Sequence, residues 1–568
     1  MKMNGLEFVL SRPWTRFYHS KVNPNITAPL VPLHQLFDDT CSKYPKKVAA
    51  IFLDTPVTFE ALKNFSDRFA SALRKLGVGK GSRVMIVLPN SIQFIVSYYG
   101  ILKTGATVVP VNPLSTGQEI KELAKLSEAK VIVTLDLFID EVMGALGETT
   151  VKHVVVTNIA DHLPALKRTL GKILKKIPSK QLPSNSSIMS YVEMISGPVE
   201  RIEADVNPEK DLASIQFTGG TTGFPKGVML THHNIVSNIF QMYEFIRPYL
   251  DEANERFAAL LPFYHIYGQS VILGAGLLMG NTLVVFPRLE LEKFMRDLEK
   301  YDVTIFPGVP TLFNLMSNHR LADQLRYPKL KMVISGADML PPEVAENFEK
   351  KFGRKIVEGY GLSEASPVTH VNPPDKVKRG SFGIPIPSTL AAIINPETRE
   401  FLGPGEVGEI IVSGPQVMQG YLGQDNSNVF LYEAGRKWLR TGDMGQMDSD
   451  GYFYFTERAK DIIKHKGFTV FPAEIEKVLY ESDAVKEAAV VGIPDPVVGE
   501  KIVAAVVLKP GYGPEQVKTL HELCHSKLAE YKRPSEIILV DELPKSLVGK
   551  MLRRRVRDIV KEKLSHAM

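Results

Sequence analysis

Short apolar runs alternate with amphipathic stretches through most of the chain. The runs at 82–89 (SRVMIVLP), 106–111 (ATVVPV) and 129–135 (AKVIVTL) are typical of buried strands. The stretch 59–77 (FEALKNFSDRFASALRKLG) has the spacing of an amphipathic helix. Regular alternation of strands and helices predicts parallel sheets in an α/β domain.

The pattern changes in the last third of the sequence. From Gly403 to Tyr454 short β runs are separated by Gly and Pro, as at 408–414 (GEIIVSG) and 451–455 (GYFYF), which predicts a small β subdomain. After Arg458 come a helical segment (AEIEKVL), two strands (EAAVVGI and KIVAAVVL), a helix near 514–530 and a basic tail. We therefore predict an N-terminal domain of residues 1–459 and a smaller α+β domain of residues 460–568.

Composition narrows the class of protein. The 568 residues exceed one ordinary core, and 44% apolar with 23% charged residues is typical of a soluble globular enzyme. A net charge of +5 is small for this length and does not argue for nucleic acid. Cys41 and Cys524 have no ligand or redox spacing, which favours a reducing compartment. The start has no long apolar core, and the apolar stretch 271–286 is too short to span a bilayer. We expect a cytoplasmic protein, with a peripheral position at the inner face of the membrane as the alternative.

The alternative of a peripheral membrane position rests on the segment 164–178 (PALKRTLGKILKKIP). One helical face would hold Leu166, Leu170, Ile173, Leu174 and Ile177, and the other Arg168, Lys172, Lys175 and Lys176. A basic amphipathic helix of this kind can rest on an anionic lipid surface. The other interpretation is a surface helix that packs on the body of the protein, and the sequence leaves both open.

Residues 218–227 (TGGTTGFPKG) form a loop rich in glycine and threonine after an apparent strand, ASIQF. Glycines let backbone N–H groups approach phosphate oxygens, hydroxyls add donors, and Lys226 adds a positive charge. It is not the usual P-loop, because Pro225 precedes the lysine and Gly227 follows it. A purely structural loop is the alternative. The candidate phosphate-binding residues are Thr218, Gly219, Gly220, Thr221, Thr222, Gly223 and Lys226.

This loop resembles the phosphate-binding signature of the adenylate-forming enzymes, which include acyl-CoA synthetases, luciferases and peptide-synthetase adenylation domains. Further matches follow in the family's order at 359–364 (GYGLSE), 441–443 (TGD), 457–476 (ERAKDIIKHKGFTVFPAEIE) and 544–554 (PKSLVGKMLRR). The similarity covers nearly the whole chain. The Thr-Gly-Gly variant is most similar to bacterial long-chain fatty acyl-CoA synthetases, and Ser363 stands where the family usually has Thr.

The resemblance implies both a fold and an activity. The fold is α/β, with a large N-terminal domain of two doubly wound α/β subdomains plus a small β-barrel-like subdomain, and a small mobile α+β C-terminal domain. The activity is ligation of a medium- to long-chain fatty acid to coenzyme A, with ATP and Mg²⁺, through an acyl-adenylate. Ligation to a carrier protein, an aryl acid substrate and a non-catalytic membrane-associated nucleotide sensor are the alternatives. A homodimer is compatible with the family.

The resemblance also assigns a nucleotide site. Its residues are Gly336, Ala337, Glu358, Gly359, Tyr360, Ser363, Glu364, Asp443 and Arg458. Tyr360 is expected to stack on adenine, with core packing as the alternative. Asp443 is expected to bind the ribose hydroxyls beside Arg458, and Glu364 to hold Mg²⁺ with Thr221.

The remaining assignments concern catalysis. In the family the lysine at Lys550 bridges carboxylate and α-phosphate during adenylation, and Lys460 marks the hinge of a rotating C-terminal domain. Rotation would bring Lys464, Lys466 and Gly467 to the acyl-adenylate and CoA. His265 matches a histidine between the nucleotide and acyl sites, with a packed core histidine as the alternative. Arg288 is a looser candidate for CoA phosphate, and the acyl pocket is expected among segments 263–278, 306–316 and 335–340, where Gly274 and Gly276 would leave a tunnel open.

Overall fold

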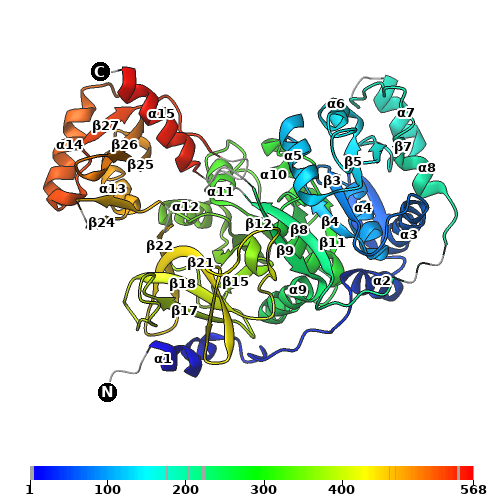
Figure 1. The fold of residues 1–568 in the computed structure, drawn as a ribbon, viewed down its shortest axis with the longest axis horizontal. Coiled ribbons are helices and arrows are strands. Elements are labelled where there is room, and N and C mark those ends of the chain that lie inside the picture. The colour runs from blue at the N-terminus through cyan, green and yellow to red at the C-terminus, as the bar shows by residue number, and fades with distance from the viewer. Residues whose placement is uncertain are drawn as a thin grey trace.

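Four β-sheets organise the described part of the chain, and helices cover most of their faces (Figure 1). The computed structural model describes residues 5–173, 177–200, 202, 204–218, 225–458, 461–466, 468–545 and 551–566. The first two sheets are α/β layers of the N-terminal domain, the third is antiparallel, and the fourth belongs to the C-terminal domain. The predicted fold class is confirmed.

The first sheet has eight strands in the order β19-β9-β8-β4-β3-β5-β6-β7. It runs parallel from β8 to β7, while β9 and β19 are antiparallel at one edge. The predicted strands at 82–89, 106–111 and 129–135 are confirmed as β3, β4 and β5. The bounds are β3 Arg83–Val87, β4 Thr107–Pro110, β5 Val131–Leu135, β6 His153–Thr157, β7 Ile188–Ser190, β8 Leu212–Thr218, β9 Lys226–Thr231 and β19 Gly420–Tyr421.

The second sheet has nine strands in the order β16-β15-β14-β13-β12-β10-β11-β1-β2. The strands from β1 to β14 along this order are parallel, and β2, β15 and β16 are antiparallel at the two edges. The bounds are β1 Val48–Phe52, β2 Thr55–Thr58, β10 Arg256–Ala259, β11 Thr282–Val285, β12 Ile305–Gly308, β13 Met332–Ser335, β14 Ile356–Gly361, β15 Val368–Val371 and β16 Ile384–Pro385.

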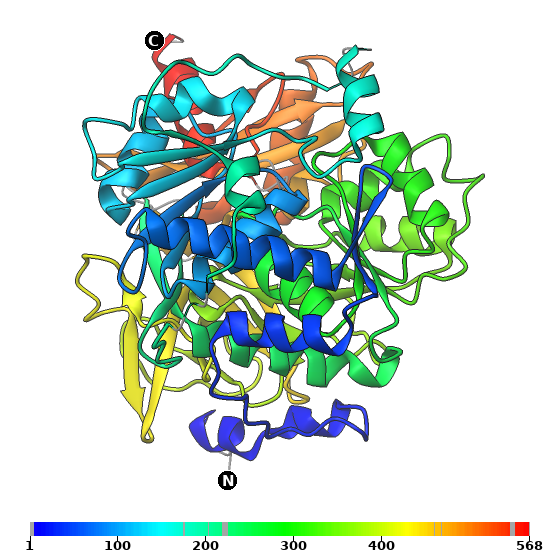
Figure 2. The same ribbon diagram turned by 90° about the vertical axis from the view of Figure 1, so that its right-hand side faces the viewer.

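Helices fill the space between and outside these two sheets. Helix α9 contacts β8, β9 and the π-helix η4, which in turn contacts β10 and β11. Figure 2 shows α2 and α3, the blue helices, lying across one side of the domain. The helices are α1 Gly5–Ser11, η1 Pro13–Phe17, α2 Leu33–Lys43, α3 Phe59–Lys75, α4 Ile92–Lys103, α5 Gly117–Ser127, η2 Asp136–Phe138, α6 Ile139–Met143, α7 Ala165–Ile173, α8 Tyr191–Ser196, α9 His232–Ile246, η3 Arg247–Tyr249, η4 Gly268–Leu278, α10 Leu291–Lys300, α11 Pro310–Ser317, α12 Pro342–Phe352 and η5 Ser363–Ala365.

Helix α4 shows how the sequence specifies a central position. All of its residues are buried, as expected for a helix that is apolar on every side. Its one charged residue, Lys103, lies 2.7 Å from Asp38 of α2 and also pairs with Asp67 of α3. The buried charge is therefore compensated by two carboxylates. The predicted amphipathic helix at 59–77 is confirmed as α3.

The third sheet has the order β17-β18-β21-β20, with β22 paired to β21. It begins at Leu390, whereas the predicted start was Gly403. The prediction missed this first strand, LAAII, because it is fully buried and lacks the Gly and Pro residues that separate the other strands. The bounds are β17 Leu390–Ile394, β18 Gly408–Ser413, β20 Phe430–Glu433, β21 Arg436–Met447 and β22 Phe453–Arg458.

The C-terminal sheet has the order β24-β23-β26-β25, with β27 paired to β26. The predicted basic tail is instead a helix, α15, which buries Val556 and Val560 against this sheet. Strand β22 ends at Arg458 and β23 begins at Ile463, on either side of the predicted domain boundary. The bounds are β23 Ile463–His465, β24 Phe468–Val470, α13 Pro472–Leu479, β25 Val485–Asp495, β26 Gly499–Leu508, α14 Gln516–Lys527, η6 Glu530–Lys532, β27 Glu536–Leu539 and α15 Arg553–His566.

The predicted helix at 164–178 is described as α7 up to Ile173. Its apolar residues Leu166 and Ile173 are 72% and 70% exposed, so these two side chains do not pack on the body of the protein. Lys167 fixes the helix to the β1–β2 turn by donating a hydrogen bond to the carbonyl of Asp54 at 2.8 Å. Within the described ranges, no helix has the length and apolar character needed to cross a membrane.

Candidate nucleotide and acyl-transfer site

The glycine- and threonine-rich loop connects β8 to β9. Thr218 and Lys226 are paired across the two antiparallel strands, so the loop closes at their ends. Residues 219–224, which include Gly219, Gly220, Thr221, Thr222 and Gly223, lie outside the described residues. Thr231 caps the start of α9: its hydroxyl accepts from the backbone N–H of Asn234, and the Asn234 side chain accepts from that of Thr231.

Strand β14 brings Tyr360 to the third sheet. Its hydroxyl donates a hydrogen bond to Oδ2 of Asp443 on β21, with 2.5 Å between the oxygens. On the same carboxylate, Oδ1 lies 3.6 Å from Nε of Arg458, the residue paired with Asp443 on β22. Burial and the neighbouring Asp443 charge raise the pKa of Tyr360 well above its usual value, so the phenol stays protonated. Tyr360, Asp443 and Arg458, scattered in the sequence, form one contiguous group.

The Thr-Gly-Asp turn fixes the position of Asp443. The Thr441 hydroxyl donates to the carbonyl of Ile410 at 2.6 Å and accepts from the backbone N–H of Asp443 at 3.1 Å. Gly442 has φ +70, a left-handed conformation that favours glycine. Its N–H donates to the buried carboxylate of Glu409.

A second group contains Glu364 of η5. The hydroxyl of Tyr421 on β19 donates to Oε1 of Glu364 at 2.7 Å. Nζ of Lys226 lies 4.9 Å from the centre of the same tyrosine ring, at the distance of a cation–π contact. Tyr421 therefore contacts both Lys226, at the end of the predicted phosphate loop, and Glu364, the predicted metal ligand.

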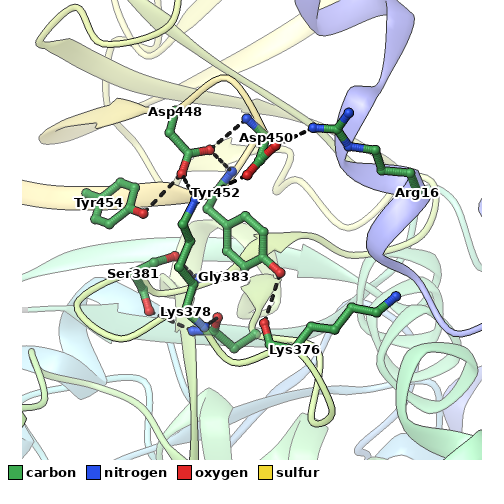
Figure 3. Close-up of polar contacts among 10 residues, drawn as sticks. Arg16, Lys376, Lys378, Ser381, Gly383, Asp448, Asp450, Tyr452 and Tyr454 are labelled. Carbon is green, nitrogen blue, oxygen red and sulfur yellow. Dashed lines mark hydrogen bonds and ion pairs between the residues drawn. The ribbon is translucent and has the colours of Figure 1, made fainter.

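The group Tyr360, Asp443 and Arg458, the predicted nucleotide platform, is supported from behind. Phe382 packs on Tyr360 with 4.5 Å between ring centres. The segment that carries Phe382 is held by the polar cluster in Figure 3, where Lys378 pairs with Asp448, and Tyr452 donates to the carbonyl of Lys376 at 2.9 Å. Burial raises the pKa of Asp448, but its hydrogen bonds, chiefly from Lys378, hold it below its usual value. The cluster therefore keeps a charged network next to the platform.

The predicted base pocket lies at the ends of β13 and β14. Gly336 follows β13, and a side chain there would lie 3.2 Å from the ring of Tyr267. Ala337 has φ +70, which is uncommon for a residue with a side chain. Burial raises the pKa of Glu358 on β14 to about 7. Ser363, buried at the start of η5, completes this set of predicted residues.

Comparisons with known proteins show the family of the chain. The AMP-binding enzyme family matches residues 37–422, and the AMP-binding enzyme C-terminal domain matches residues 474–550. The chain belongs to the AMP-binding enzyme family. It is similar to a long-chain-fatty-acid–CoA ligase of Bacillus subtilis (37% identity, covering 96% of this chain and 97% of the relative) and to a probable 4-coumarate–CoA ligase 1 of Dictyostelium discoideum (35% identity, covering 96% and 98%). Among solved structures, ATP-bound MatB from Rhodopseudomonas palustris matches with a TM-score of 0.78 at 25% identity over 93% of this chain and 99% of MatB.

In this AMP-binding enzyme residues 268–278 of the predicted acyl segments are all buried. His265 has an exposed side chain, so the alternative of a packed core histidine is wrong. The following residues form the π-helix η4, a conformation that is often found at functional sites. Gly274 and Gly276 do not leave a tunnel open. A side chain at Gly274 would lie 2.5 Å from Ile239, and one at Gly276 would lie 2.9 Å from Leu283. These glycines instead permit close packing.

The candidates for CoA contact lie on other elements. Lys464 is on β23, and Lys466 is in the β23–β24 turn with φ +50. Gly467, the hinge residue Lys460 and the catalytic candidate Lys550 lie outside the described residues. Arg288 is on the surface and pairs with Glu290 at 2.8 Å.

The two domains of this AMP-binding enzyme meet next to the predicted hinge. The buried carboxylate of Glu457 on β22 accepts a hydrogen bond from the N–H of Ala473 at the start of α13. Arg553 of α15 lies 3.4 Å from the same carboxylate and makes a two-pronged contact with Glu476. Glu457 is buried and Arg553 only 15% exposed, so a charge here would be costly to leave unpaired. The contact therefore fixes α15 and α13 to each other and to β22.

Neither Tyr421 nor Arg553 was predicted as a site residue, although Arg553 lies within the 544–554 motif. Arg553 stands in a run of basic residues that resembles a solvated tail. The spacing of Val556 and Val560 is a signal for a helix with a buried face, which would have placed Arg553 at its start. Tyr421 lies in a Gly-rich stretch, and nothing in its local pattern marks it.

Proposed function

We propose that this chain is an ATP-dependent fatty acid:CoA ligase that forms acyl-CoA, AMP and pyrophosphate through an acyl-adenylate. The observation that carries the proposal is the convergence of Tyr360, Asp443 and Arg458 beside the Glu364–Tyr421–Lys226 group. The similarity to a long-chain-fatty-acid–CoA ligase over nearly the whole chain supports a fatty acid as the acid substrate.

The chemistry explains why these groups are needed. A free carboxylate is a poor acyl donor, and its attack on the α-phosphate of ATP converts it to a mixed anhydride. Both reactants are anions, so the site must screen their repulsion and hold them in line. Asp443 fixes the ribose, Tyr360 supports adenine, and Lys226 faces the phosphates.

Magnesium fits the donor set of this site. Mg²⁺ is usually bound by one or two carboxylates together with substrate phosphates. Within the described part of the chain no group of three or more His, Cys, Asp or Glu residues is arranged as a metal site. Glu364 offers one such carboxylate, and Thr221 of the phosphate loop would be its protein partner. When bound, the ion would neutralise charge on the phosphates of ATP.

The reaction type can be decided by product analysis. With ATP, CoA and a fatty acid, we expect AMP and pyrophosphate in equal amounts, because the loop lacks the Gly-Lys-Ser/Thr sequence of γ-phosphate chemistry. Product formation should require both the acid and CoA. A panel of medium-chain, long-chain and aryl acids, each with CoA or with a carrier protein, separates the proposal from its alternatives. Stoichiometric ADP would overturn it, and a preference for aryl acids would favour an aryl-CoA ligase.

We further propose that the two half-reactions use different parts of the C-terminal domain, taken as residues 460–568. Lys550 would act in adenylation, and the Lys464–Gly467 turn in thioester formation, with rotation about Lys460 between them. The order of the family motifs supports this division. A charge at the developing oxyanion lowers the adenylation barrier, whereas thiolate attack needs a nearby cation and close approach of CoA to the backbone.

Separate assays of the half-reactions check this division. Lys550→Ala should slow adenylation by about 10²–10³ and leave acyl transfer from supplied acyl-adenylate nearly unchanged. Gly467→Leu should do the reverse. Lys518→Ala, on an exposed lysine of α14, is the matched control and should affect neither. Equal loss of both half-reactions in the first two variants would mean that one fixed site serves both steps.

Helix α7 is the basis of a proposal about location. We propose that it contacts anionic lipid, because Leu166 and Ile173 are exposed on a helix whose sequence is otherwise rich in basic residues. Apolar insertion and electrostatic attraction would act together.

Vesicle sedimentation measures this contact. Replacing Leu166 and Ile173 together by Ser should weaken binding to phosphatidylglycerol vesicles at least about tenfold, since each side chain contributes about 1.5–3 kcal/mol when fully buried. Val497→Ser, at a residue that is 88% exposed in the C-terminal domain, is the control and should bind normally. Unchanged binding of the double variant at low salt would assign α7 no role at the membrane.

A further inference from the structure

Tyr421 lies between two groups of the proposed nucleotide site, although none of the family motifs quoted above includes it. Its hydroxyl donates to Oε1 of Glu364 at 2.7 Å, and its ring lies 4.9 Å from Nζ of Lys226. The side chain is half-buried. One residue therefore contacts both the predicted metal ligand and the charged end of the phosphate loop.

The backbone around Tyr421 is fixed from two sides. Strand β19 pairs with β9, and the N–H of Leu422 donates to the carbonyl of Gly227 at 2.8 Å. On the other side the Asn426 side chain accepts from the N–H of Tyr421 at 2.8 Å and donates to its carbonyl at 3.2 Å. Gly420 makes room for this contact, since a side chain there would lie 2.9 Å from Asn426. These contacts engage both the N–H and the carbonyl of Tyr421.

The orientation of Glu364 follows from this fixed tyrosine. The backbone carbonyl of Glu364 accepts from the N–H of Met418, three residues before Tyr421, at 2.9 Å. Both the main chain and Oε1 of Glu364 are therefore held by the segment that leads into β19. The Tyr421 hydroxyl is a donor to this carboxylate, on Oε1. A carboxylate restrained in this way loses little conformational freedom when it binds a cation.

The tyrosine ring has a separate effect on Lys226. The face of an aromatic ring attracts an ammonium group without forming an ion pair with it. A carboxylate at the same place would compete with phosphate for the lysine. The ring can thus restrain the lysine without neutralising it.

We propose that Tyr421 is a positioning residue that couples Mg²⁺ binding to ATP binding. Its hydroxyl orients the Glu364 carboxylate for the ion, and its ring restrains Lys226 in the same group of residues, so that metal and phosphates are bound together. The proposal rests on the proposed function only in taking ATP and Mg²⁺ as the ligands.

The direct test measures ATP dissociation constants by calorimetry without fatty acid, once in EDTA and once in saturating Mg²⁺. Tyr421→Phe removes the hydroxyl and keeps the ring. The factor by which Mg²⁺ strengthens ATP binding should fall about tenfold in this variant, because a hydrogen bond to a charged group is lost. The ATP dissociation constant in EDTA should not change. Tyr421→Leu removes the ring as well and should also weaken ATP binding in EDTA. Tyr432→Phe, at a tyrosine that is 71% exposed on β20, is the control and should match the wild type.

A double-variant cycle shows whether Tyr421 acts through Glu364. In a Glu364→Ala background, the further change Tyr421→Phe should have no effect on the Mg²⁺ dependence. A thermal unfolding curve for each variant separates misfolding from loss of positioning. The inference is overturned if the factor by which Mg²⁺ strengthens ATP binding in Tyr421→Phe stays within twofold of the wild-type factor. It is also overturned if Tyr421→Phe lowers that factor as much in the Glu364→Ala background as in the wild type.

The same samples separate this inference from the proposed function. Wild-type protein that binds ATP with Mg²⁺ but releases no AMP with fatty acid and CoA contradicts the proposed function, and the binding constants still decide the role of Tyr421. Wild-type protein whose ATP binding does not respond to Mg²⁺ contradicts the role of Tyr421, whatever products it forms.

Discussion

The hydrogen bond between Tyr360 and Asp443 joins the two parts of the chain on which the nucleotide site depends. Tyr360 belongs to the large second sheet, and Asp443 to the antiparallel third sheet. The two oxygens lie 2.5 Å apart, and Tyr360 is largely shielded from water. A hydrogen bond to a charged acceptor is strong in such surroundings. If the sheets shifted relative to each other, a buried carboxylate would lose its donor. The contact therefore fixes the surface on which ribose and adenine would lie.

A second connection ties that surface to the phosphate loop. The short strand β19 belongs to the first sheet by its pairing with β9, yet its Tyr421 contacts Glu364 beyond the end of β14. Groups from all three sheets of the N-terminal domain are thus held by contacts of 2.5–2.7 Å. The C-terminal domain adds its own buried contact, from Arg553 to Glu457 near the predicted hinge. The chemistry is therefore placed at junctions between sheets.

The sequence predicted the elements better than it predicted these junctions. Strands such as Arg83–Val87 and the helix Phe59–Lys75 follow from local periodicity, and the nucleotide residues follow from motifs that resemble a known family. The start of the third sheet and helix α15 were misjudged, because a fully buried strand has no alternation and a run of arginines conceals two buried valines. Gly274 and Gly276 suggested an open tunnel, but the side chains of Ile239 and Leu283 fill that space. Tyr421 was missed because its role arises only when β19 pairs with β9, which is a long-range contact without a local signal.

We propose that Asp443, oriented by Tyr360, binds the ribose of ATP. This binding can be measured most directly by comparing dissociation constants for ATP and 2′,3′-dideoxy-ATP in the absence of fatty acid. Wild-type protein should bind the dideoxy nucleotide about ten to a hundredfold more weakly, the value of hydrogen bonds to a charged group. In Asp443→Ala this difference should disappear, and in Tyr360→Phe, which keeps the ring, it should shrink. If Asp443→Ala still discriminates between the two nucleotides as the wild type does, Asp443 does not bind the ribose and the site must be placed elsewhere.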